Sequence, residues 1–281
     1  MRRPEFIARQ SGCPSGLLGR LIGSIMATET AGANDAVVAA LALQPSDCVV
    51  EIGFGHGRTL DRVARQLTAG GAAGIDLSET MVRMTARRCR DLIAAGRVTL
   101  HQGDSTRLPF PDGHFNKAYS VHTLYFWTHP EDHLREIHRV LCSGGRLALG
   151  FHTDEAPGAR DFPETVYRFY SQAEVETLLQ DAGFSKALLT EPTLHRGFVT
   201  AVATRSSVRL ARREEVSSEH PEGRRAHPLR RRAAQEGAGR RRARRLRLEG
   251  RALSEEMGRA ETAPRQAAQR QFSSSFAHHL R

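Results

Sequence analysis

The segment from Val49 to Gly57 constrains the fold of this 281-residue chain more than any other feature. It reads Val-Val-Glu-Ile-Gly-Phe-Gly-His-Gly, an apolar strand that ends in an acidic residue and runs into a glycine-rich turn. A second short apolar segment, Gly74-Ile75, ends in Asp76, nineteen residues after Gly57. Glycine lets the backbone turn sharply and approach a ligand closely. A carboxylate at the end of the second strand can accept hydrogen bonds from ribose hydroxyls. The two strand ends therefore predict a nucleoside-containing cofactor.

The spacing of the glycines indicates which cofactor this is. The dinucleotide fingerprint G-x-G-x-x-G requires a third glycine three residues after the second, but Arg58 stands there. Gly53, Gly55 and Gly57 instead form the pattern E-x-G-x-G-x-G with Glu51. This pattern resembles motif I of the class I S-adenosylmethionine (SAM) dependent methyltransferases, and the resemblance implies SAM and not NAD. A strand-to-helix turn that binds no ligand is the alternative, and the acidic end of the second strand argues against it.

Further segments extend the resemblance. Residues 103–110 read Gly-Asp-Ser-Thr-Arg-Leu-Pro-Phe, and residues 135–141 read Arg-Glu-Ile-His-Arg-Val-Leu and precede Gly144-Gly145. In this order and spacing they are similar to the third-strand, fourth-strand and fifth-strand regions of the methyltransferase type 11 domain family. The resemblance covers roughly residues 47–151.

The resemblance implies cofactor contacts at the ends of the first four strands. Glu51 would receive the ammonium group, directly or through water, and Asp76 the ribose hydroxyls. Asp104 and Ser105 would meet the adenine edge. The leucine and the methionine that follow the second strand would pack on the adenine faces, with plain core packing as the alternative. The complete predicted cofactor set is Glu51, Gly53, Phe54, Gly55, Gly57, Asp76, Leu77, Met81, Asp104, Ser105, Ser120 and Val121.

The end of the fourth strand is the candidate acceptor site. Ligands of open α/β sheets bind outside the carboxyl ends of the strands, which places His122 near the reacting end of the cofactor. We predict His122 as a general base; a histidine that only hydrogen-bonds the cofactor or the backbone is the alternative. Tyr125 and Trp127 are predicted to line an acceptor pocket, with core packing as the alternative. Methyl transfer depends mainly on proximity and orientation, so a dedicated catalytic residue need not exist.

Short apolar strands alternate with helices from residue 47 onward, which predicts an α/β fold. The expected strands are residues 48–52, 72–75, 98–102, 118–121, 146–151, 185–190 and 197–204, and the expected helices 58–67, 79–94, 130–141 and 172–182. The last two strands lack room for a helix between them, so we expect an antiparallel pair. The sequence therefore predicts a three-layer Rossmann-like fold with a seven-stranded, mostly parallel sheet and an antiparallel terminal hairpin.

The first 46 residues are expected to form a helical lid. Apolar residues recur at helical spacing and indicate one apolar face; they are Leu17, Leu18, Leu21, Ile22 and Ile25. A further helix is expected over residues 36–43, capped by Asn34-Asp35. We expect the lid and the region after Phe151 to line the acceptor pocket.

The positive charge is concentrated at the C-terminal end. The net charge of the chain is +10, and residues 206–281 hold 19 Arg, no Lys, 9 Glu and no Asp, which is the whole excess. This segment has few apolar residues, which predicts disorder. We expect three parts: a lid over residues 1–46, a methyltransferase domain over 47–204 and an Arg-rich disordered tail over 205–281. A functional basic extension and read-through of a shifted reading frame both remain open for the tail.

The expected function is methyl transfer from SAM to a small-molecule acceptor. A nucleic-acid methyltransferase that uses the tail is a second hypothesis. Against it, the fourth strand is not followed by the Asp/Asn-Pro-Pro-Tyr/Phe box of amine methylation, and the tail lacks aromatics that stack on bases. A SAM-binding protein without catalysis is the third.

The remaining sequence features exclude several classes. Four scattered cysteines predict neither a zinc site nor a disulfide framework, and Cys48 is expected to be a small buried residue. Neither a secretory signal nor a membrane span is predicted, so a cytoplasmic location is expected. The acceptor, the methylated atom and the oligomeric state stay open.

Overall fold

Seven strands form one sheet in the order β3-β2-β1-β4-β5-β7-β6. The computed structural model describes residues 4–190 and 197–206. The strands are β1 (Cys48–Ile52), β2 (Gly71–Asp76), β3 (Val98–Gln102), β4 (Phe115–Val121), β5 (Leu141–His152), β6 (Leu188–Thr190) and β7 (Phe198–Thr204). β7 runs antiparallel to β5 and to β6, and the other neighbouring pairs are parallel. This confirms the predicted sheet and its antiparallel terminal pair.

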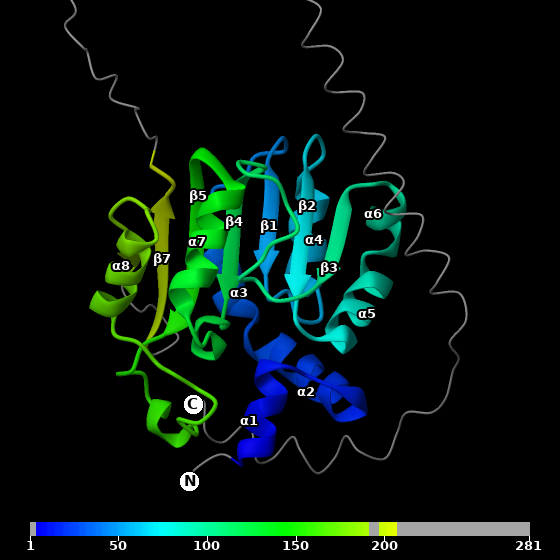
Figure 1. The fold of residues 1–281 in the computed structure, drawn as a ribbon. Coiled ribbons are helices and arrows are strands. Elements are labelled where there is room, and N and C mark those ends of the chain that lie inside the picture. The colour runs from blue at the N-terminus through cyan, green and yellow to red at the C-terminus, as the bar shows by residue number, and fades with distance from the viewer. Residues whose placement is uncertain (1–3, 191–196, 207–281) are drawn as a thin grey trace, which may run out of the picture.

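Helices cover both faces of the sheet (Figure 1). One face carries α3 (Ala31–Ala40), α4 (Arg58–Gln66), α5 (Glu79–Arg88) and α6 (Arg90–Ala94), and the other carries α7 (Pro130–Val140) and α8 (Gln172–Asp181). Two helices, α1 (Glu5–Gly12) and α2 (Gly16–Glu29), lie beyond the arrowheads of β1, β2 and β4 (Figure 1). Two short 3-10 helices, η1 (Leu124–Phe126) and η2 (Ala159–Asp161), follow β4 and β5. The lid helices therefore stand over the carboxyl ends of the central strands.

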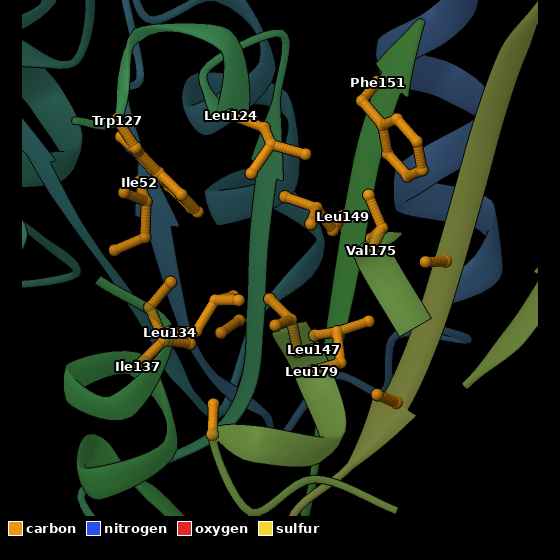
Figure 2. Close-up of a cluster of buried hydrophobic side chains, with 14 of the residues drawn as sticks. Ile52, Leu124, Trp127, Leu134, Ile137, Leu147, Leu149, Phe151, Val175 and Leu179 are labelled. Atoms are coloured by element: carbon orange, nitrogen blue, oxygen red, sulfur yellow. The ribbon is translucent and has the colours of Figure 1, made fainter. Parts of the chain in front are cut away.

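The alternation of side chains along the strands produces two cores. Successive strand residues point to opposite faces, so β5 sends Leu147 and Leu149 to one face and Ala148 to the other. Figure 2 shows Leu147 and Leu149 beside Val175 and Leu179 of α8, and all four are fully buried. Truncating one of these leucines to alanine would cost about 2–5 kcal/mol, because a cavity would be left behind.

The N-terminal helices differ from the prediction. The helix predicted over residues 36–43 is wrong at its start, because α3 begins at Ala31 and the Asn34 amide donates to the Thr30 carbonyl (2.8 Å) from inside the helix. The apolar face predicted for α2 is buried only in part. Ile22 is buried, whereas Leu17 and Leu18 in the first turn are exposed, because only the side of α2 that faces its neighbouring helices is covered.

Two other local expectations are wrong. The helix predicted over residues 79–94 is divided into α5 and α6, because Cys89 leaves the helical conformation (φ −91°, ψ 17°). Leu92 of α6 is thereby turned into the core. Cys48 is exposed and not buried, since it opens β1 at the edge of the core, where its N–H donates to the Asn116 side chain. The predicted tail lies outside the described residues except for its first two positions.

Candidate active site

A cavity of about 420 Å³ lies at the carboxyl ends of the central strands. Strand order reverses between β1 and β4, and such a switch point is where open α/β sheets bind ligands. The loops after β1, β2, β3 and β4 form the walls, and residues of α1, α2 and α3 close the cavity from the lid side. The sequence-predicted loops therefore meet in one place.

The three glycines of the loop after β1 differ in the space around them. All three have left-handed φ values, +73° at Gly53, +55° at Gly55 and +74° at Gly57. A Cβ at Gly53 would lie 2.3 Å from the Thr123 methyl, and one at Gly57 would lie 2.3 Å from the Thr85 methyl. A Cβ at Gly55 would meet no atom within 4 Å. Packing thus requires the two outer glycines, whereas the middle one leaves free space at the cavity wall.

Asp76 is held in place by two backbone amides. The Gly55 N–H donates to its Oδ2 (2.7 Å) and the Ser78 N–H donates to its Oδ1 (2.9 Å). The pKa of Asp76 is raised from its ordinary value, because burial raises it more than these two hydrogen bonds lower it. A carboxylate has about four acceptor positions, so each oxygen keeps capacity for a ligand hydroxyl. Ser78 caps α5 by accepting a hydrogen bond from the Met81 N–H, and its hydroxyl donates to the Pro14 carbonyl, which ties the lid to the same turn.

Glu51 is a buried acid at the end of β1. It is 3% exposed and lines the cavity. Tyr119 stands beside it on β4, and the Tyr119 hydroxyl donates to the Glu51 Oε2 (2.7 Å). Burial raises the pKa of Glu51 to about 8; the hydrogen bond from Tyr119 lowers it and the charge of Asp76 raises it. Glu51 therefore takes up a proton near neutral pH, which an ordinary glutamate does not.

A polar and aromatic cluster forms the wall beside β3. Asp104 accepts from the Thr106 N–H (2.8 Å), and the Ser105 hydroxyl lies 2.7 Å from Nδ1 of His133 on α7. The His133 ring stacks on Trp127 with centroids 4.7 Å apart and an interplanar angle of 8°. Burial lowers the pKa of His133, while the charge of Asp104 raises it. The neutral His133 ring, stacked on Trp127, offers a flat surface beside Asp104.

His122 follows β4 with an unusual backbone. Its φ of +58° lies in the left-handed region, where residues other than glycine are uncommon. Its Nδ1 lies 3.1 Å from the Tyr125 hydroxyl, and its ring stacks on His152 of β5. His122 lines the cavity, whereas Tyr125 is buried behind it. Tyr125 therefore reaches the cavity through His122 and not by direct contact.

Most of the predicted site residues line this cavity. Gly57, Ser120 and Tyr125 lie outside its wall; the other predicted residues are Glu51, Gly53, Phe54, Gly55, Asp76, Leu77, Met81, Asp104, Ser105, Val121, His122 and Trp127. The Ser120 hydroxyl donates to the Ile52 carbonyl (2.9 Å) and is buried inside the sheet. The N-terminal helices contribute to the wall as expected. The part of the chain described after Phe151 does not.

Several lining residues were not predicted from the sequence. Two, His56 and Thr123, belong to loops that had been singled out, and their position beside motif residues was the available signal. Burial lowers the pKa of His56 to about 4, so it is neutral at physiological pH. His133, Met26 and Asn34 come from helices in which no local pattern marks a site.

No cluster of three His, Cys, Asp or Glu suited to a metal ion occurs within residues 4–190 and 197–206. Within the same ranges, no helix combines the length and the apolar character needed to cross a bilayer.

Comparison with known proteins agrees with this geometry. Residues 50–149 match the family model described as a methyltransferase domain. The chain is 29% identical to the uncharacterized methyltransferase YdaC of Bacillus subtilis, over 54% of this chain and 80% of YdaC. It is 28% identical to the ubiquinone/menaquinone biosynthesis C-methyltransferase UbiE of Ectopseudomonas mendocina, over 55% of this chain and 73% of UbiE.

A solved structure shares the fold. The SAM-dependent methyltransferase of Aquifex aeolicus superposes with a TM-score of 0.51 and is 22% identical, over 61% of this chain and 89% of that one. The matched domain, its seven-stranded fold and the loops that meet at the switch point lead to one assignment. Residues 50–149 form a methyltransferase domain of the class I SAM-dependent type, and SAM is the cofactor of this domain.

Proposed function

We propose that this protein transfers a methyl group from SAM to a small-molecule acceptor. The observation that carries the proposal is the cavity at the switch point, because its volume of about 420 Å³ falls within the range of small-ligand sites. Its wall combines apolar side chains such as Met26, Phe126 and Trp127 with a few polar groups. Such a composition suits a small, partly apolar acceptor beside the cofactor.

The residues at the strand ends fit the cofactor. The free space at Gly55 leaves room for a ligand against the backbone, and Asp76 has acceptor capacity for ribose hydroxyls. Glu51 would accept a hydrogen bond from the ammonium group, while Asp104 and Ser105 would meet the adenine edge. The apolar lining residues of the same set are Phe54, Leu77, Met81 and Val121.

The chemistry needs little from the protein beyond positioning. The bound cofactor supplies a methyl group on a sulfonium, which is already a good leaving group. Holding two reactants in line contributes about 7–11 kcal/mol in favourable cases. The hydrogen bond from the Ser78 hydroxyl to the Pro14 carbonyl holds the lid against the turn after β2, and the strand-end loops would orient both reactants. We also propose a division into lid, domain and tail, with boundaries at residues 46 and 204, because β1 begins at Cys48 and β7 ends at Thr204.

A small-molecule acceptor is favoured over the two alternatives. UbiE is a C-methyltransferase of quinone biosynthesis by its name, and its likeness to this chain supports an acceptor of that size. Shared fold does not fix the reaction, so a SAM-binding protein without catalysis is the rival. The nucleic-acid hypothesis depends on residues 206–281, which lie almost wholly outside the described residues.

The experiment is a turnover assay with methyl-labelled SAM and a panel of phenols, quinols, amines and thiols. We expect release of S-adenosylhomocysteine (SAH) that depends on one class of acceptor and is lost in Asp76→Ala. Binding of SAH without turnover of any panel member would favour the non-catalytic alternative. Transfer to RNA that is salt-sensitive and lost on truncation after Thr204 would favour the nucleic-acid alternative.

A further inference from the structure

His122 is held by contacts on several sides. A left-handed φ at a residue other than glycine persists only where the surroundings maintain it, and such residues cluster at functional sites. The His122 N–H donates to the Gly150 carbonyl (2.9 Å). Its ring centroid lies 5.2 Å from that of His152 and 5.2 Å from that of Phe198. The imidazole at the cavity wall is thus fixed in one orientation.

The Tyr125 hydroxyl has two polar partners within the described residues. Its oxygen accepts a hydrogen bond from the backbone N–H of His152 and lies 3.1 Å from Nδ1 of His122. Tyr125 is 5% exposed, and burial raises its pKa well above the ordinary value, so the hydroxyl keeps its proton. A hydroxyl carries one proton, and a backbone N–H can only donate. The proton of Tyr125 is therefore directed at Nδ1 of His122.

We propose that Tyr125 is a positioning residue that places the proton of neutral His122 on Nε2. A neutral imidazole has one N–H and one lone pair. If Tyr125 donates to Nδ1, the lone pair of the ring is already used. His122 then acts in the site as a hydrogen-bond donor. It does not act as the general base that its position suggests.

The opposite arrangement is less favourable. If Nδ1 of His122 carried the proton, it would donate to the Tyr125 oxygen, and that oxygen would have two donors directed at it. The hydroxyl proton would then have no acceptor within the described part of the chain. An unsatisfied buried donor is costly, so the geometry selects the Nε2–H form.

The inference deepens the proposed function and rests on it for its catalytic meaning. With His122 as a donor, methyl transfer would proceed without removal of a proton by this residue. Acceptors whose nucleophile already carries an available lone pair at neutral pH would fit such a site. The position of the His122 proton can be measured without any methyl acceptor. A failure of this inference can therefore be distinguished from a failure of the proposed methyl transfer.

The test is nitrogen-15 NMR of the histidine rings in the full chain at pH 8. Long-range proton–nitrogen spectra distinguish a protonated ring nitrogen from one that carries a lone pair. The His122→Gln variant identifies the His122 signals by their loss. We expect the wild type to show lone-pair character at Nδ1 and a proton at Nε2. In Tyr125→Phe the nitrogen-15 chemical shifts of both ring nitrogens should move toward the average of the two tautomers.

A matched control separates the hydroxyl from general repacking. Tyr170 is 2% exposed and its hydroxyl has no hydrogen-bond partner within the described residues, so Tyr170→Phe should leave the His122 signals unchanged. A proton on Nδ1 in the wild type would overturn the proposal, and this result needs no variant to fold. Unchanged His122 signals in a folded Tyr125→Phe protein would also overturn it.

Discussion

Replacement of Glu51 by Gln should change how the stability of the ligand-free protein depends on pH. Glu51 is 3% exposed, and burial raises its pKa to about 8 from an ordinary value of 4.5. Below pH 4.5 the carboxyl is protonated in both the folded and the unfolded chain. Between pH 4.5 and 8 the unfolded chain loses this proton while the folded chain keeps it, so unfolding releases a proton and stability falls as the pH rises.

The size of the effect follows from the shift in pKa. One pKa unit corresponds to about 1.4 kcal/mol, so the raised pKa of Glu51 corresponds to a loss of about 5 kcal/mol at most across this window. Glutamine does not titrate and its amide oxygen can still accept the hydrogen bond from Tyr119. The stability of Glu51→Gln relative to the wild type should therefore increase from pH 5 to pH 8 by several kcal/mol.

The assay is urea unfolding of both proteins, without cofactor, at pH 5, 6, 7, 8 and 9. Other titrating groups are common to both proteins, so the difference between the two curves isolates Glu51. A difference that rises with pH and levels off above pH 8 is expected. Parallel curves over the whole range would refute the reasoning, because the carboxyl would then titrate alike in the folded and unfolded chains.

Three further predictions concern the cofactor and the tail. Asp76→Ala should weaken SAH binding by about 1.5–3 kcal/mol, the value of a hydrogen bond to a charged acceptor; unchanged calorimetric affinity would remove the ribose assignment. Gly55→Val should abolish SAH binding, because its side chain would enter the cavity or strain the left-handed turn at φ +55°; an unfolded circular dichroism spectrum would make the glycine a folding requirement instead. A chain ending at Arg205 should keep its melting cooperativity and SAH affinity and lose its attraction to polyanions; weaker SAH binding at fixed ionic strength would show that the boundary is wrong.

The sequence predicted those elements whose signals are local. The strands over residues 48–52 and 98–102 have the predicted bounds. The first is an apolar run and the second alternates apolar and polar residues, and turn residues flank both. The start of α3 was not predictable from Asn34, since this residue caps helices in some sequences and donates from within the helix here. The break at Cys89 was not predictable either, because tertiary packing of Leu92 decides it.

The site was predictable to the extent that topology determines it. The parallel sheet brings the ends of β1, β2, β3 and β4 to one edge, so Glu51, Asp76 and Asp104 meet there although they are distant in sequence. His133 was missed because its ring reaches the cavity from a helix face without any motif. The aromatic residues next to Tyr125 in the sequence led to its prediction as a pocket residue. The structure places it behind the cavity wall, against His122.

A crystal structure of the complex with SAH tests the central claim most directly. The account predicts SAH in the cavity between the lid helices and the strand ends, with its ribose hydroxyls on Asp76 and its amino group toward Glu51. The remaining space should lie beside His122 and Trp127. Density for SAH outside this cavity, or a ribose turned away from Asp76, would contradict the account.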